Sequence, residues 1–72
     1  MRKAPTLITN NIRRLRFNAD EMTQAVLAER VGVTRQTLSA IESAKYSPTL
    51  ELAFKIALVF QLPLGEVFQY AE

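Results

Sequence analysis

Residues 23–42 read TQAVLAERVGVTRQTLSAIE, and this stretch decides the fold. Its apolar residues recur three and four positions apart on either side of Gly32, which predicts two short helices joined by a tight turn. Thr23 and Thr34 each precede one of these helices and are suited to capping a helix N-terminus. Gly32 suits a turn that needs a left-handed backbone. We therefore expect a helix-turn-helix whose second helix spans residues 34–43.

The second helix of this motif carries a polar face. Because Leu38 and Ile41 point towards the first helix, Arg35, Gln36 and Ser39 share the opposite side. One cation, one amide and one hydroxyl on a single face are suited to reading hydrogen-bond patterns on base pairs. A polar face on an isolated helix is usually only solvated surface. The partner helix and the turn favour the interpretation that this helix reads DNA.

The stretch and the following SAKYSPTLELAFKIA at residues 43–57 resemble the repressor-type helix-turn-helix of phage repressors and Cro proteins, the Xre family. The resemblance runs from about Asn10 to about Phe68 and includes several motifs in the same order. It implies an all-α domain of five helices over residues 10–72, preceded by a flexible arm at residues 1–9. It also implies that the protein is a transcriptional regulator, with a homodimeric repressor reading a palindromic double-stranded DNA operator.

The resemblance also gives roles to individual residues. Base contacts would come from Arg35, Gln36, Ser39 and Ala40. Phosphate contacts would come from Thr23, Gln24, Thr34, Lys45, Tyr46 and Ser47, for which ordinary exposed side chains are the alternative. An ion pair between Arg16 and Glu42 would fix the reading helix on the core, although two separate surface charges are also consistent with the sequence.

Two loops depart from the family pattern. Residues 18–21 make a loop about one residue longer than usual and without a glycine, which shifts the register of the first helix. Ala44 stands where the family usually has glycine at the end of the reading helix. Because glycine closes a helix C-terminus most easily, we expect this helix to end less sharply.

The fourth helix has more apolar residues than one core needs. Between residues 50 and 60 only Glu51 and Lys55 are polar, which predicts burial on more than one side. The expected core positions are Leu52, Ala53, Ile56 and Ala57. A last helix is expected after Leu62, with Pro63 at its first position. The candidates for a dimer interface are Phe54, Leu58, Val67, Phe68 and Tyr70, and the alternative is that they complete the core.

The N-terminal segment at residues 1–7 shows no helical period and is predicted to be a disordered tail. A basic arm that touches DNA phosphate is the alternative. Leu7 and Ile8 could add an edge strand to a partner, but the sequence shows no second strand. Thr9 or Asn10 is expected to cap the first helix.

Composition narrows the function further. The chain has 72 residues, no Cys, no His and a net charge of +2, which is compatible with nucleic acid without proving it. Disulfides, Cys/His zinc sites and His-based catalysis are excluded, and we expect no enzyme, cofactor, metal or small-molecule ligand. With no membrane-spanning run and no signal-peptide core, the cytoplasm is the default location. An antitoxin that binds a protein partner is the alternative function.

Overall fold

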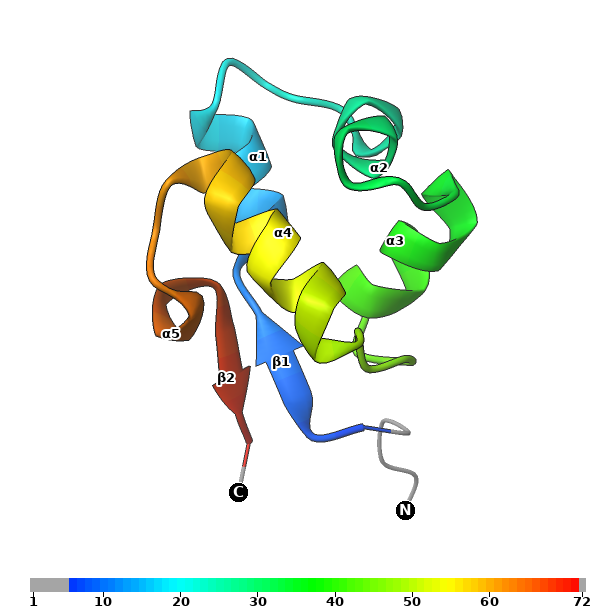
Figure 1. Ribbon diagram of the computed structural model, residues 1–72, viewed down its shortest axis with the longest axis vertical. Helices are drawn as coiled ribbons and strands as arrows, with labels where there is room; N and C mark the ends of the chain where they lie inside the picture. The colour runs from blue at the N-terminus through cyan, green and yellow to red at the C-terminus, as the bar shows by residue number, and fades with distance from the viewer. Residues whose placement is uncertain (1–5, 72) are drawn as a thin grey trace.

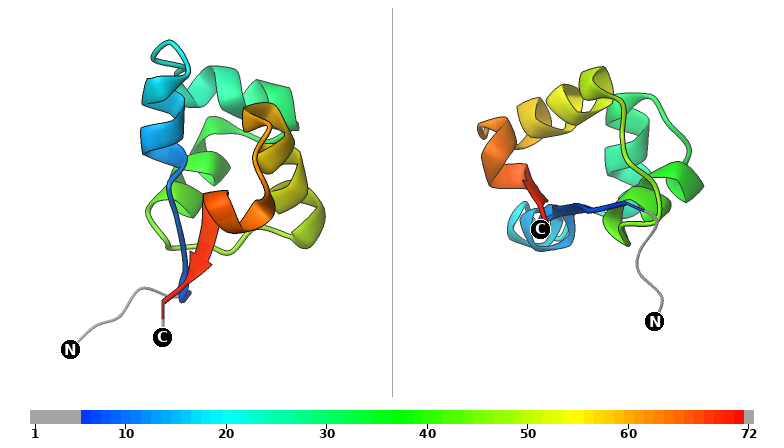
Figure 2. Two further views of the ribbon diagram at one scale, coloured as in Figure 1. Left: turned by 90° about the vertical axis from the view of Figure 1, so that its left-hand side faces the viewer. Right: turned by 90° about the horizontal axis from the view of Figure 1, so that it is seen from below.

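The computed structural model describes residues 6–71, which form five helices and two short strands (Figure 1). Their order is β1 (Ile8–Asn10), α1 (Ile12–Asn18), α2 (Gln24–Val31), α3 (Arg35–Glu42), α4 (Leu50–Phe60), α5 (Leu64–Val67) and β2 (Phe68–Tyr70). In the view from below, α4 lies on one side of the molecule while α1 and α3 lie on the other (Figure 2). The predicted five-helix fold is confirmed.

Threonine caps begin three of the helices. The hydroxyl oxygens of Thr23, Thr34 and Thr49 each accept a hydrogen bond, 3.1 Å long, from the backbone N–H three residues further on. The caps predicted at Thr23 and Thr34 are confirmed. Helix α1 begins differently: the side chain of its N-cap, Asn11, makes no capping bond within the described residues, while Asn10 Oδ1 accepts from the first N–H of the helix at 3.0 Å.

Helices α2, α3 and α4 end in the same backbone motif. Gly32, Ala44 and Gln61 follow these helices with left-handed φ angles of 80°, 61° and 56°. In each case the next N–H donates to a carbonyl five residues earlier: Val33 to Ala28, Lys45 to Ala40 and Leu62 to Ala57. This is the Schellman motif. Helix α3 therefore ends sharply, contrary to our expectation, because Ala44 adopts the conformation that glycine usually takes there.

One apolar core joins all five helices. Its buried members are Ile12, Leu27, Ala28, Val31, Leu38, Ile41, Leu52, Ile56, Ala57 and Val67. The four core positions predicted for α4 are all buried, including Ala53 beside this cluster. Val67 is 0% exposed, since the single turn of α5 directs it into the core. Its predicted place in a dimer interface is therefore wrong.

The ends of the described chain meet in a two-stranded antiparallel sheet that the sequence analysis did not predict (Figures 1 and 2). Ile8 pairs with Tyr70, and Asn10 pairs with Phe68. The partner strand that residues 7–8 lacked in the sequence analysis thus lies at the C-terminus of the same chain. Phe68 begins this strand instead of continuing the last helix.

The sheet also revises the N-terminal arm. Residues 8 and 9, which we expected to be flexible, belong to β1, and beyond the strand the Ala71 N–H donates to the Leu7 carbonyl at 2.7 Å. Residues 1–5 of the predicted arm lie outside the described residues. Among residues 6–71, no helix is both long enough and apolar enough to cross a membrane.

Candidate nucleic-acid interface

The outer face of α3 carries the four residues predicted to contact bases. Arg35 and Gln36 are exposed, and Ser39 and Ala40 are partly exposed. The opposite side of the helix is anchored by Leu38, which is 0% exposed. The helix-turn-helix therefore brings these four side chains together on one open surface, and none of them is buried in the core.

Arg16 and Glu42 join α1 to the end of α3. Arg16 Nε donates to Glu42 Oε2 at 2.7 Å and Arg16 Nη2 donates to Oε1 at 3.0 Å, so the pair is bidentate. The two side chains are only 14% and 8% exposed. Arg16 Nη1 also donates to the Met22 carbonyl at 2.9 Å, which ties the same guanidinium to the loop before α2. The longer loop thus does not prevent the ion pair that the resemblance implied.

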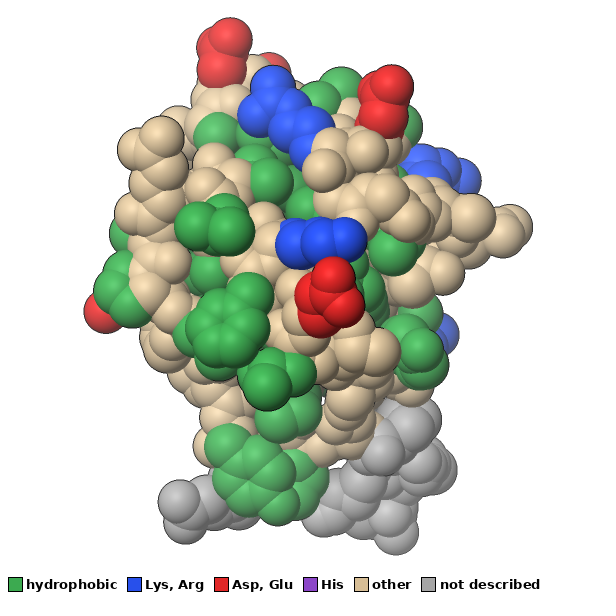
Figure 3. All heavy atoms as spheres, in the orientation of Figure 1, with side chains coloured by type: hydrophobic (Ala, Val, Ile, Leu, Met, Phe, Trp, Pro, Cys, Tyr) green, Lys and Arg blue, Asp and Glu red, His purple; other side chains and the backbone are tan. Residues whose placement is uncertain are grey.

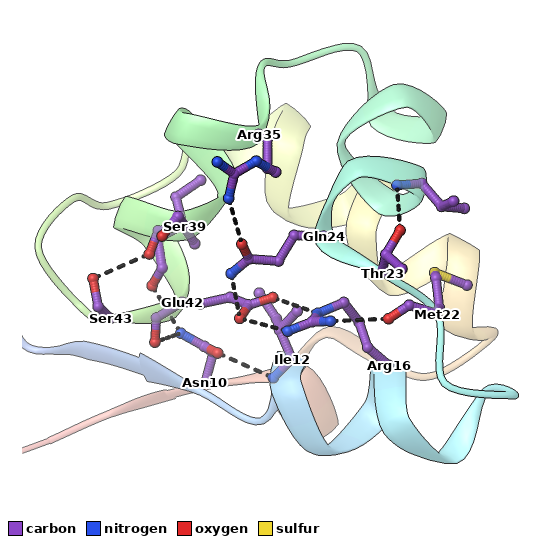
Figure 4. Close-up of polar contacts among 12 residues, drawn as sticks. Asn10, Ile12, Arg16, Met22, Thr23, Gln24, Arg35, Ser39, Glu42 and Ser43 are labelled. Carbon is purple, nitrogen blue, oxygen red and sulfur yellow. Dashed lines mark hydrogen bonds and ion pairs between the residues drawn. The ribbon is translucent and has the colours of Figure 1, made fainter.

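Gln24, at the start of α2, bonds to α3 on two sides (Figure 4). Its Nε2 donates to Glu42 Oε1 at 3.1 Å, and its Oε1 accepts a long bond of 3.4 Å from Arg35 Nη1. We call Arg16, Glu42, Gln24 and Arg35 the polar network. Because Glu42 requires a donor, it orients the Gln24 amide with its oxygen towards Arg35. One amide N–H of Gln24 remains for another acceptor.

Gln24 was predicted to contact a phosphate, and these internal bonds were not predicted. The only hint in the sequence was that a carboxylate paired with one arginine still has lone pairs for a further donor.

Asn10 was likewise expected only as a helix cap. Its Nδ2 donates to the carbonyls of Ile41 at 2.9 Å and Glu42 at 3.4 Å, so β1 satisfies carbonyls at the end of α3.

The candidate phosphate residues lie around α3 without forming one cluster. Thr23 and Thr34 are exposed, although both hydroxyl oxygens already cap helices. Tyr46 is 51% exposed and lines a shallow groove whose other lining residues are Thr34, Gln36, Thr37 and Ala40. Lys45 and Ser47 are exposed in the same loop but do not line that groove.

A family model described as Helix-turn-helix matches residues 12–67. The chain belongs to this helix-turn-helix family. The membership expected from the resemblance to Xre and Cro-type proteins is thereby confirmed. The matched residues include all five helices of the structure, among them the two helices that carry the candidate interface.

Several curated relatives are similar over most of the chain. An uncharacterized HTH-type transcriptional regulator of Archaeoglobus fulgidus is 48% identical over 59 residues, covering 82% of this chain and 79% of that protein. One from Methanocaldococcus jannaschii is 49% identical, covering 71% and 77%. YgzD of Bacillus subtilis, also named as an uncharacterized HTH-type transcriptional regulator, is 49% identical, covering 68% and 74%.

A solved structure shares the fold. The crystal structure of a Bacteroides fragilis protein superposes with a TM-score of 0.74, covering 86% of this chain and 98% of that one. The two sequences are 24% identical, so this likeness shows the fold alone.

Proposed function

We propose that this protein binds specific sites on double-stranded DNA and regulates transcription, with α3 lying in the major groove. The observation that carries the proposal is the open polar face of α3, held in place by the α2 helix and by the polar network. The names of the curated relatives, HTH-type transcriptional regulators, support it. Because the curated relatives are archaeal and bacterial and DNA lies in the cytoplasm of such cells, the proposal places the protein there.

Base recognition would come from the outer face of α3. Within residues 6–71 Arg35 donates a single long bond, to Gln24, so its other guanidinium N–H groups are available for guanine O6 and N7. Gln36 matches adenine N6 and N7, Ser39 suits either base, and Ala40 offers an apolar contact to a thymine methyl.

Backbone contacts would fix the register of α3 on the duplex without reading its sequence. The proposed contacts are those of Thr23, Gln24, Thr34, Lys45, Tyr46 and Ser47. Gln24 would use the amide N–H that Glu42 leaves free. Since Lys45 and the arginines neutralise phosphate charge, binding would weaken as salt rises.

We further propose a homodimer that represses by covering a promoter. Leu50, Phe54 and Leu58 lie four residues apart on α4 and are 67%, 50% and 74% exposed, and Tyr70 is 64% exposed. Figure 3 shows hydrophobic side chains gathered over α4 and towards the chain termini. Such an exposed apolar area is typical of an interaction surface. In Figure 4 α4 lies behind the polar network, so a partner on this face would leave α3 open.

A two-fold dimer would present two copies of α3 to successive major grooves about 34–36 Å apart on a palindromic site. Selection of bound sites from random duplex DNA tests the proposal. The expected result is an enriched palindrome with half-sites about one helical turn apart. Enrichment of a single half-site would refute the dimer, and no enrichment at any salt concentration would refute sequence-specific binding.

The exposed α4 face also fits a second candidate function. An antitoxin would use this face to bind and neutralise a different protein, and DNA binding would be secondary. Purification under native conditions separates the two. A homodimer by mass at micromolar concentration supports the regulator, whereas a stoichiometric complex with a second protein that blocks self-association supports the antitoxin.

A further inference from the structure

A groove beside the start of α2 is lined by three arginines from two helices. Arg13 and Arg16 come from α1 and Arg35 comes from α3. Thr23 and Gln24, both proposed to contact phosphate, line the same groove. A duplex that meets these two residues and the outer face of α3 therefore lies over the mouth of this groove.

The three arginines differ in how many donors they have left. All three guanidinium nitrogens of Arg16 donate inside the protein, two of them to Glu42 and one to the Met22 carbonyl. Arg35 is needed for the proposed base contact. Arg13 is exposed, and within residues 6–71 it forms neither a hydrogen bond nor an ion pair. Arg13 is thus the cation of this groove whose donors are uncommitted.

The direction of Arg13 follows from the helix period. Residues three and four apart share a side of a helix, which places Arg13 beside Arg16 and Phe17 on α1. Phe17 is 66% exposed and lines the same groove, where it forms an apolar wall. Arg14 is rotated by about 100° from Arg13 and does not line this groove. Arg14 is therefore a control of the same charge that is also exposed but lies outside this groove.

One acidic side chain, Glu21, also lines the groove. Since Arg16 is neutralised by Glu42, the remaining charges are those of Arg13, Arg35 and Glu21, which sum to one positive charge. A groove of this sign attracts an anion, and Glu21 weakens that attraction.

We propose that Arg13 contacts a DNA phosphate in this groove, which extends the backbone contacts from α2 onto α1. The inference rests on the proposed DNA-binding function and adds a residue of α1 to the proposed phosphate contacts. Because the contact is to phosphate, it positions the protein and carries no base preference.

The test compares Arg13→Gln with Arg14→Gln by measuring DNA affinity over a series of salt concentrations. Log affinity falls as log salt rises, and each lost phosphate contact makes this negative slope shallower by about 0.9. We expect this change for Arg13→Gln on both the selected site and random DNA, and no change of slope for Arg14→Gln. Arg13→Lys should keep the wild-type slope. Glu21→Gln should raise the affinity, since it removes the acidic side chain from the groove.

The possible results distinguish a failure of the Arg13 contact from a failure of the proposed DNA-binding function. If wild-type protein binds its site but the slopes for Arg13→Gln and Arg14→Gln are equal, the phosphate contact of Arg13 is refuted and the proposed function stands. If wild-type protein binds no DNA at any salt concentration, both are refuted. Circular dichroism of each variant checks that the substitutions at these exposed positions leave the helices intact.

Discussion

Ala44→Gly should stabilise this protein. Ala44 follows α3 with a φ of 61°, in the left-handed region, and the Lys45 N–H beyond it closes the helix on the Ala40 carbonyl at 2.9 Å. Alanine is strained in this conformation because its Cβ approaches the following carbonyl oxygen. Glycine adopts the same conformation without that contact.

The magnitude follows from two opposing terms. A left-handed conformation costs an L-residue about 1–2 kcal/mol, whereas the greater freedom of glycine in the unfolded chain costs about 0.4–1 kcal/mol. We therefore expect the free energy of unfolding to rise by about 0.5–1 kcal/mol, which raises the Tm of a domain this small by about 2–8 °C.

Two further variants serve as controls. Ala19 follows α1 with a φ of −99°, so Ala19→Gly has only the unfolded-state term and should lower stability. Gly32 has a φ of 80°, and an added Cβ there would meet no atom within 4 Å. Gly32→Ala should therefore lower stability by about 0.5–1 kcal/mol, because the backbone strain of a left-handed alanine outweighs the lost freedom of the unfolded chain.

Urea titration at a fixed protein concentration measures all three variants, because a dimer would make stability concentration-dependent. The Ala44→Gly midpoint should rise with an unchanged m-value. If Ala44→Gly is no more stable than wild type while Ala19→Gly loses stability as expected, then a left-handed alanine does not strain the end of α3 and the reasoning is wrong.

Three other changes test the interface and the ion pair. Glu42→Leu should lower the free energy of unfolding by about 3–5 kcal/mol, since it leaves Arg16 unpaired, while the double variant with Arg16→Met should recover part of that loss; unchanged urea midpoints for both single variants would contradict the pairing. Arg35→Ala should weaken specific binding by about 1–3 kcal/mol and relax base choice at one position, and equal losses on cognate and random DNA would argue against base reading. Leu58→Lys, at a 74% exposed position, should lower the dimer mass in light scattering with helicity unchanged, and an unaltered mass would place the interface elsewhere.

Most of the helical fold could be predicted because its signals are local. The threonines before α2, α3 and α4 and the glycine in the turn mark helix ends within a few residues of sequence. The core of α4 follows from its period in the same way. The left-handed conformations of Ala44 and Gln61 could not be predicted, because the fold imposes a conformation that neither residue type favours.

The sheet was missed for a different reason. Its strands have the sequences ITN and FQY, which are too short to show an alternating pattern, and their partners lie about sixty residues apart along the chain. The prediction that Val67 belongs to a dimer interface was wrong for a related reason. Only the position of the four-residue helix α5 next to β2 shows that this side chain points into the core.

The candidate interface was predictable in its outer face but not in its internal bonds. Helix periodicity places Arg35 and Gln36 on one side without any knowledge of the rest of the fold. The contacts of Gln24 with Glu42 and Arg35 depend on how three helices pack, which the sequence does not specify. The sequence also gives no reason to separate Arg13 from Arg14, whereas the packed helices bring only Arg13 into the arginine-lined groove.

The hydrogen bond between Leu7 and Ala71 gives this small domain a nearly circular backbone. A short linker joining these two positions would leave every helix in place, and new termini could be opened in the exposed loop at Asp20 and Glu21. In such a circular permutant the helix-turn-helix would stand at the start of the polypeptide, while the order of its two helices would remain unchanged.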